Sequence, residues 1–458
     1  MPRMTQTQAA KKTGRDLTKG SIIGNLLSLS GPMIATESIY TLSVLEMVWV
    51  GRLGAAALAG VGIAFIVVML ILTAQIGLSV AARAMIARAI GAGNEAEANH
   101  VARQGIFLAV SYGLVMTVVG VTLAGPILRV FNLEPDATAA GITYLRVFSL
   151  AWIPASFYLM TYGMIQASGD SVNPMKIELA MRLTQVVVTP FLVLGWAFFP
   201  KVGVGGAAMG GAAAEYIGMS LAIWLLTSGR TRLHLGLKGF RPDFEVIRRL
   251  IRVGLPASVM NIQLSVSSIV IAGIMVPFGT AAVAGHSLLS RIQQMLFLPN
   301  FGLSLGAGVL VGQNLGAREP GRAQRTGWTA AGLAGGLSFT LAVAVLVWAN
   351  SIARVFVTDP QTVALTATFL RIAAVAIMVS GVSSALQQSI NGAGDTMIPM
   401  IVGVLTVWAL QIPLAFLLPR FTSLGVFGVR WAMVSTYAAG ALIYMAYFKS
   451  GRWKRTQV

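Results

Sequence analysis

The sequence predicts an all-α membrane protein with twelve transmembrane helices, arranged as two six-helix lobes related by a pseudo-two-fold axis along the membrane normal. Three observations lead to this prediction. The 458 residues are 56% hydrophobic and only 10% charged, with a mean hydropathy of +0.77, whereas soluble domains carry roughly 25% charged residues. Apolar runs of about 20 residues, each long enough to cross a bilayer as a helix, recur about twelve times. A pattern of residues in the first half also returns in the second half at constant spacing.

The chain is expected to begin with a cytoplasmic tail and then to enter the membrane directly. Residues 1–20 are polar and basic, and no short apolar stretch with a small-residue cleavage site follows them, which argues against a removable signal peptide. The spanning segments are expected to be helices, because a chain in lipid must satisfy its own backbone hydrogen bonds and alternation at strand period is weak here.

The net charge of +18 is explained by the side of the membrane on which the basic residues fall. With both termini inside, 24 of the 33 Lys and Arg residues lie in inner tails and loops, eight, including Arg430, lie outside, and Arg291 lies near a membrane interior. This bias follows the positive-inside rule and predicts a multi-pass protein of the plasma (bacterial inner) membrane with both termini cytoplasmic. Contact with membrane lipids accounts for the charge, so we expect no nucleic-acid partner.

An internal repeat divides the chain into two similar halves. Segment 166–175 matches segment 391–400 at an offset of 225, and the same offset aligns Gly54 with Gly279. Each unit has an even number of helices, so both insert in the same orientation. We expect a monomer with five parts: a cytoplasmic N-tail (1–20), an N-lobe of helices 1–6 (21–227), a cytoplasmic linker (228–248), a C-lobe of helices 7–12 (249–447) and a cytoplasmic C-tail (448–458).

The repeated motif itself, Gly-Asp-[Ser/Thr]-x-x-Pro-Met, predicts helix caps rather than catalytic carboxylates. Asp170 and Asp395 each follow a Gly and precede a Pro, the chemistry that ends one helix and starts the next.

Acids inside the N-lobe helices are the strongest functional candidates, because an ionisable side chain in a span costs about 2.5–3.5 kcal/mol on insertion scales. Helix 1 carries Glu37 and Glu46. They are nine residues apart, a spacing that puts two side chains on opposite faces of a regular helix. Glu215 lies well inside helix 6, with no basic residue within a turn. Glu178 and Arg182 are spaced for an intrahelical ion pair, which predicts a structural role.

The C-lobe lacks this chemistry, because its helices carry no Asp or Glu at depth and Ile271 occupies the position that matches Glu46. We expect the C-lobe to offer neutral polar surface to a substrate. The candidate residues of a substrate cavity, two of them in the N-lobe, are Gln263, Gln294, Asn300, Arg291, Trp152 and Tyr158.

Several classes of chemistry are excluded by what the sequence lacks. The three histidines have no metal-ligand spacing, so no metal site is expected. There is no P-loop, so no ATP bound to this chain would drive transport, and there is no dinucleotide fingerprint or cysteine. A membrane-embedded enzyme would need a clustered His/Asp/Glu constellation, which the sequence does not show, so we expect no enzyme and no cofactor.

The motifs resemble those of the multidrug and toxic compound extrusion (MATE) family of cation-coupled exporters. The similar segments are Glu46-Met-Val-Trp-Val-Gly-Arg-Leu-Gly54, Gln313-Asn-Leu-Gly-Ala317, both Gly-Asp-[Ser/Thr] loops and the Gly-Val-x-Gly openings of helices 6 and 12. The resemblance covers nearly the whole chain. It implies alternating access and export of lipophilic, often cationic small molecules in exchange for protons or sodium. A lipid or oligosaccharide flippase of the same superfamily is the alternative, although it should show a more basic central cavity.

The resemblance also implies where the coupling cation acts. The acid that the family carries on helix 1 is Glu46 here; Gln185 and Thr189 occupy positions on helix 5 where some members have Asn and Asp; and Glu215 stands where a helix 6 Gln is usual. These residues, with Glu37, are the candidate cation-coupling site, although Glu37 lies nearer the cytoplasmic end of helix 1, where a polar boundary role is an equal alternative. Protons are favoured over sodium as the coupling ion.

Overall fold

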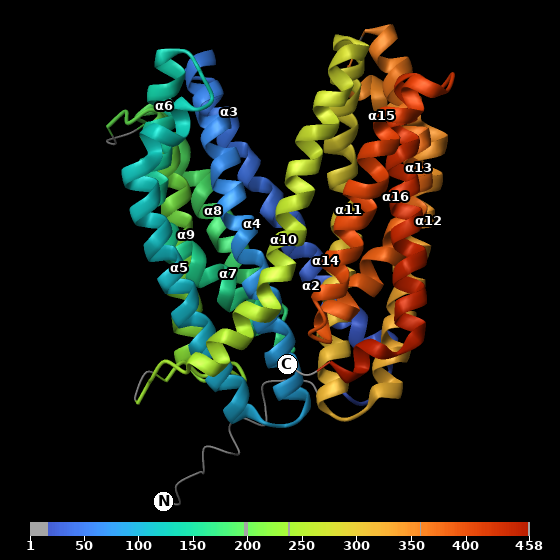
Figure 1. Ribbon diagram of the computed structural model, residues 1–458. Helices are drawn as coiled ribbons and strands as arrows, with labels where there is room; N and C mark the ends of the chain where they lie inside the picture. The colour runs from blue at the N-terminus through green and yellow to red at the C-terminus, as the bar shows by residue number, and fades with distance from the viewer. Residues whose placement is uncertain (1–16, 197–199, 237–238, 358, 457–458) are drawn as a thin grey trace, which may run out of the picture. The chain divides into compact units, whose positions relative to one another are not determined.

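The computed structural model describes residues 17–196, 200–236, 239–357 and 359–456, and these form helices joined by short connections (Figure 1). Most of the predicted N-tail, 1–16, lies outside the described residues. The first half contains α2 (Ile22–Tyr40), η2 (Thr41–Val44), α3 (Leu45–Gly51), α4 (Ala55–Gly91), α5 (Glu95–Arg129), α6 (Pro135–Ser149), α7 (Trp152–Ala167), α8 (Val172–Leu194) and α9 (Val204–Thr227). The second half contains α10 (Phe244–Met275), η3 (Val276–Phe278), α11 (Thr280–Gly316), α12 (Pro320–Phe356), α13 (Pro360–Gly392), α14 (Met397–Val404), η4 (Leu405–Gln411), α15 (Ile412–Phe421), α16 (Val426–Ser450) and η5 (Arg452–Arg455).

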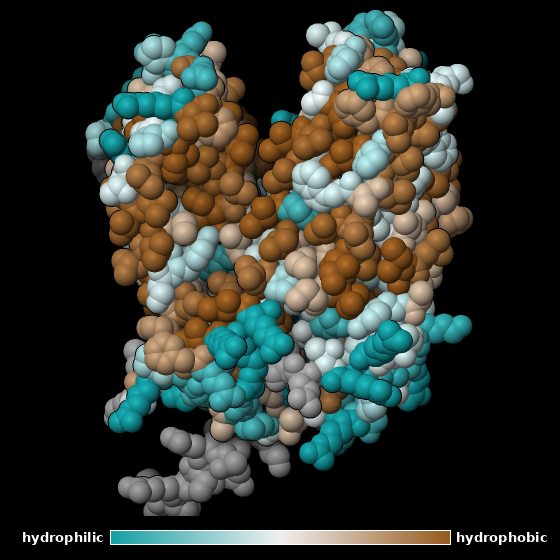
Figure 2. Space-filling view, in the orientation of Figure 1, coloured by the Kyte–Doolittle hydropathy of each residue, from teal (hydrophilic) through white to brown (hydrophobic). Residues whose placement is uncertain are grey.

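The number of spanning helices agrees with the sequence. Eleven helices among the described residues are long and apolar enough to cross a membrane, and the bent pair α6 and α7 supplies a twelfth. On the visible face, hydrophobic side chains cover the middle of the helices and hydrophilic ones gather near their ends, as expected for a protein solvated by lipid (Figure 2). The prediction of an all-α membrane protein with twelve spans is confirmed.

The helix bounds repeat with the same offset as the sequence motifs. α4 and α11 begin 225 residues apart and end 225 residues apart, and the same offset relates both ends of the α6–α7 pair to those of α13. The two halves therefore repeat the same order of helices, with local differences in where the helices are interrupted.

Three interruptions break the regularity of the spans. The predicted helix 1 corresponds to α2, η2 and α3, and η2 is a 3-10 turn between the two α-helices. The expectation of a regular helix 1 is therefore wrong. The prediction that Glu37 and Glu46 lie on opposite faces assumed a regular helix and does not apply. α6 and α7 meet at 59°, whereas their repeat partner α13 is continuous. η4 is a π-helix of seven residues, and such insertions bend a helix locally.

The chain divides into two compact units: unit 1 contains residues 35–258, and unit 2 contains 17–34 and 259–458. Two of the unit boundaries, Ile34/Ala35 and Ser258/Val259, fall inside helices, each two residues beyond a proline, Pro32 and Pro256. They thus differ from the predicted lobe limits at 21–227 and 249–447, and the lobe boundaries stay a prediction.

Each unit has its own apolar core. Unit 1 buries residues such as Val50, Trp152 and Val193 between its helices. Unit 2 has three clusters among its described residues, one of which includes Ile271 and Phe369. Small residues allow the closest approaches between helices. α11 and α13, for example, come so close that a Cβ on Gly392 would overlap the backbone of Gly308.

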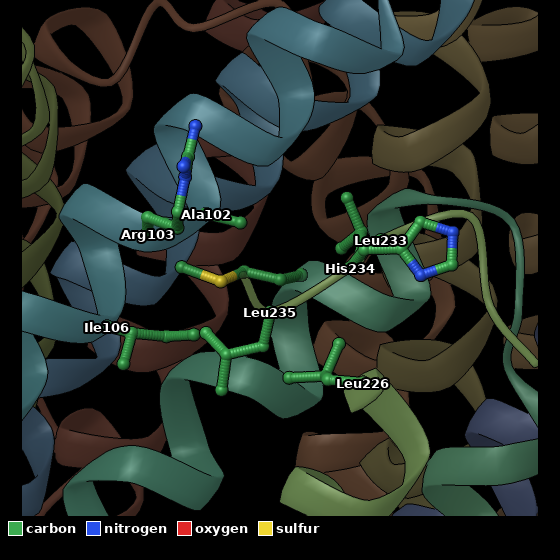
Figure 3. Close-up of a pocket in the computed structure, with 8 residues that line it drawn as sticks. Ala102, Arg103, Ile106, Leu226, Leu233, His234 and Leu235 are labelled. Atoms are coloured by element: carbon green, nitrogen blue, oxygen red, sulfur yellow. The ribbon is translucent and has the colours of Figure 1, made fainter. Parts of the chain in front are cut away.

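The connection between α9 and α10 packs against α5 within unit 1. The backbone N–H of His234 donates to Asn99 Oδ1 at 2.6 Å, and that of Asp243 donates to Gln104 Oε1 at 3.1 Å. His100 Nε2 lies 2.9 Å from Asp243 Oδ2. Side chains from α5, α7 and α9 and from the connection surround a cavity of about 10 Å³ (Figure 3). It has room for about one water molecule, far less than a drug-sized ligand needs.

Candidate cation-coupling site

One face of α8 carries the centre of the site. Glu178, Arg182, Gln185 and Thr189 are separated by four, three and four residues, the spacing that aligns side chains along a helix. All four are buried, with exposed fractions between 1% and 5%. The fold therefore places one cation, one acid and two neutral polar groups inside an apolar lobe, where each needs a partner.

Arg182 joins three of the polar groups around it. Its Nε donates to Glu178 Oε1 at 2.8 Å, which confirms the ion pair predicted from the sequence. Its Nη1 donates to Gln185 Oε1 at 2.5 Å, and its Nη2 lies 3.6 Å from Glu215 Oε1 on α9. The contact with Glu215 could not be read from the sequence, because it depends on how α8 packs against α9. The guanidinium also lies over the Tyr40 ring, at 5.2 Å from its centroid.

Glu46 belongs to the same network. Gln185 Nε2 donates to Glu46 Oε2 at 2.7 Å, so the Gln185 amide bridges Glu46 and Arg182. Glu46 is 6% exposed, its carboxyl lies within reach of the Tyr144 hydroxyl, and no hydrogen bond of normal geometry reaches its Oε1 within the described part of the chain. A Cβ on Gly211, one turn before Glu215 on α9, would lie 3.7 Å from Glu46 Oε2. The structure therefore brings Glu46, Gln185 and Glu215 together, and it leaves one carboxyl oxygen of Glu46 available.

Glu37 reaches the site less directly. Its Oε1 accepts a hydrogen bond of 3.1 Å from the Tyr162 hydroxyl, and Glu178 Oε2 accepts one of 3.0 Å from the Tyr158 hydroxyl. The two tyrosine rings on α7 have centroids 6.0 Å apart. Glu37 is thus next to the network but is held by a separate tyrosine.

Thr189 lies at the far end of the α8 face. It is 1% exposed, and no described residue accepts from or donates to its hydroxyl. A Cβ on Gly210 of α9 would come into contact with this hydroxyl, so the absence of a side chain at Gly210 makes room for it.

The charges of the network do not balance when every group is ionised. Glu46, Glu178 and Glu215 share one guanidinium, that of Arg182. Buried net charge is costly, so uptake of positive charge at a carboxyl relieves the imbalance. No group of three or more His, Asp or Glu side chains suited to a metal ion occurs in the described ranges.

The predicted cavity residues are scattered between the two units. Trp152 is fully buried in the core of unit 1, and Tyr158 donates to Glu178. In unit 2, Asn300 Nδ2 donates to Ser338 Oγ at 2.9 Å. Gln263 is also buried there, whereas Arg291 and Gln294 are exposed. Their role in a substrate cavity stays a prediction.

At the position that matches Glu46 of unit 1, unit 2 carries Ile271, which packs in an apolar core. Arg430, which the sequence analysis counts among the outer residues, is buried within unit 2: its side chain is 2% exposed and lies one turn into α16. Its side of the membrane stays a prediction.

Both repeated aspartates act as caps, as predicted. Asp170 Oδ1 accepts from the Asn173 backbone N–H at 3.1 Å at the start of α8, and Asp395 Oδ1 accepts from that of Ile398 at 3.4 Å at the start of α14. Neither therefore competes with the buried acids as a functional carboxylate.

Comparison with known proteins identifies the family. The model of the family described as MatE matches residues 32–191 and 256–417. The chain belongs to the MatE family. It is therefore a membrane transporter and not an enzyme. A protein of Thermotoga maritima named "Probable multidrug resistance protein NorM" is 24% identical over 94% of this chain and 93% of its own length. One of the same name from Deinococcus radiodurans is 26% identical over 92% and 94%.

Solved structures share the fold of this MatE family chain. A structure of the outward-facing conformation of a multidrug resistance MATE family transporter aligns over 97% of this chain and 99% of that transporter's chain, with a TM-score of 0.89 and 23% sequence identity. The first matched range of the MatE model includes Glu37, Glu46, Gln185 and Thr189, whereas Glu215 lies beyond it. The carboxyl on α9 thus lies outside the ranges that the family model matches.

Proposed function

We propose that this transporter exports lipophilic, often cationic small molecules in exchange for protons, by alternating access. The names of the two relatives support a multidrug substrate range, and the match to an outward-facing structure supports a fold that changes its accessibility. The proposal places the coupling site in unit 1, at Glu46, Gln185, Thr189 and Glu215, with Glu37 beside it.

The observation that carries the choice of protons is the position of Arg182. A sodium site needs several oxygen ligands that converge on an empty centre. Here the guanidinium already takes Glu178, Gln185 and Glu215 as partners, so a second cation would meet a fixed positive charge. A proton needs only one free oxygen, and Glu46 Oε1 offers one.

The coupling would work through the charge of Glu46. A proton that arrives from outside binds Glu46 Oε1, while Oε2 keeps its hydrogen bond from Gln185. The network then loses one negative charge, which weakens its attraction for a cationic substrate and favours release of that substrate. Loss of the proton to the cytoplasm restores the charge and the affinity. Each ligand shifts the conformational equilibrium only through such a difference in affinity.

The sidedness of this cycle follows from the predicted topology. The bias of basic residues toward the tails and inner loops supports a plasma (bacterial inner) membrane with both termini in the cytoplasm. Anionic lipids would contact these residues, and we expect the transporter to work as a monomer with no cofactor.

Transport by purified protein in lipid vesicles tests the proposal. Efflux of a fluorescent lipophilic cation should follow an imposed pH gradient, and an imposed sodium gradient at equal pH should leave it unchanged. Glu46→Gln should lose the response to the pH gradient. Glu134→Gln, at an exposed acid before α6, is the matched control and should keep it. Coupling that survives in Glu46→Gln would remove Glu46 from this role, and transport driven by sodium alone would refute proton exchange.

A further inference from the structure

Unit 2 contains a buried cation that has no carboxylate partner among the residues that the structure describes. Arg430 is 2% exposed, and none of the ion pairs found in the described ranges involves it. This differs from the buried Arg182 of unit 1, whose charge is balanced by Glu178 and Glu215. A buried charge without a counter-charge is strongly unfavourable, so a partner of opposite charge is expected.

The groups around the Arg430 guanidinium are neutral. Its Nη2 contacts His286 Nδ1 on α11, and its Nη1 lies 3.4 Å from Met433 Sδ. Arginine has no acceptor, so His286 Nδ1 must accept this hydrogen bond and the ring is neutral, with its proton on Nε2. The Phe369 ring of α13 lies under the guanidinium, with 4.6 Å from Cζ to its centroid. A thioether sulfur and a ring face are weak partners for a full charge.

Two buried donors at this place have no partner among the described residues: Arg430 Nε and the hydroxyl of Thr366. Thr366 lies one turn before Phe369 on α13. A Cβ on Gly285, the residue before His286, would lie 3.0 Å from Thr366 Oγ1 and 3.4 Å from the Phe369 ring. Thr366 on α13, His286 on α11 and Arg430 on α16 thus all lie in the neighbourhood of the Phe369 ring.

We propose that Arg430 and Thr366, supported by His286, bind a small monovalent anion such as chloride. The anion would accept from Arg430 Nε and from the Thr366 hydroxyl, the two donors that lack partners, and would balance the buried charge. Charge-assisted hydrogen bonds of this kind are stronger than neutral ones. All three side chains are buried, with exposed fractions of 7% or less, so a small ion fits this position better than a bulky organic anion.

Direct binding of radioactive chloride to the purified full-length protein tests this proposal. In a sodium gluconate background, the parent protein should bind chloride saturably and should melt at a higher temperature as chloride replaces gluconate. Arg430→Met should abolish both effects. Thr366→Val keeps the shape of the side chain and removes one donor, so the affinity should fall about tenfold, the loss typical of one hydrogen bond to a charged group.

The matched control is Arg420→Met, which removes an exposed arginine at the end of α15 and should bind chloride like the parent. If Arg430→Met does not fold, Thr366→Val decides the outcome alone. The proposal is refuted if the parent binds no chloride saturably, or if Thr366→Val binds it with unchanged affinity.

Discussion

Replacing Arg182 by methionine should destabilise the protein more than any single change at its surface. The side chain is 6% exposed, and its two carboxyl partners are 5% and 15% exposed, so the variant would leave Glu178 and Glu215 buried without a counter-charge. Breaking a buried ion pair in this way costs about 3–5 kcal/mol. For a unit of this size, 1 kcal/mol corresponds to about 2–4 °C, which gives an expected loss of about 6–20 °C in melting temperature.

Melting of the detergent-purified protein at neutral pH measures this loss. Arg146→Met, at an exposed arginine on α6, is the matched control and should melt within a few degrees of the parent. The double variant with Glu178→Gln should recover part of the loss, because it removes one of the two unpaired charges.

Sodium gives the same experiment a second readout. Without the guanidinium, the carboxyls of Glu178 and Glu215 and the amide oxygen of Gln185 would offer oxygens to a small cation, so sodium should stabilise Arg182→Met and leave the parent unaffected. The reasoning is wrong if Arg182→Met melts like Arg146→Met, or if sodium raises the melting temperature of both proteins equally.

Two further predictions concern the linker and the helix packing. The hydrogen bond from His100 lowers the pKa of Asp243 below its usual range. This contact should therefore stabilise the start of α10 at neutral pH and lose its effect as the pH falls through that lowered pKa. His100→Ala should speed amide hydrogen exchange at the start of α10 at neutral pH, and an unchanged exchange rate would contradict this prediction. Gly392→Ala should cost about 1–3 kcal/mol because the new methyl group would overlap the Gly308 backbone, whereas Gly332→Ala, which faces open space, should melt like the parent.

The fold could be predicted from the sequence because its two main signals are strong. Hydrophobic length marks each span, and the constant offset of 225 fixes the number of helices per half. The 3-10 turn at 41–44 could not be predicted, because it contains no proline or glycine. The break between α6 and α7 does have a signal in the sequence: Pro154 lacks a backbone N–H, and its ring would clash with the carbonyl of Leu150, at the end of α6, if the helix continued.

The sequence proposes the members of the candidate site but does not show the contacts between them. Glu46 and Glu215 stood out from the sequence because a buried acid is rare in a membrane helix. The sequence predicts an ion pair of Arg182 with Glu178 alone, because i,i+4 spacing is visible in a sequence. The contact of Arg182 with Glu215 depends on how α8 packs against α9, which a sequence does not show. The burial of Arg430 was missed for a similar reason, because hydropathy places a charge near a helix end without showing what surrounds it.

The two unit boundaries that fall inside helices affect how the protein can deform. A loop between rigid parts permits many angles at little cost, whereas a helix resists bending unless its hydrogen-bond ladder is already interrupted. Pro32 in α2 and Pro256 in α10 each remove one backbone donor two residues before a boundary. Each connection is therefore a stiff helix with one weakened point, at which bending is easiest. A transporter with such connections would move between a few defined states instead of through a continuous range of angles.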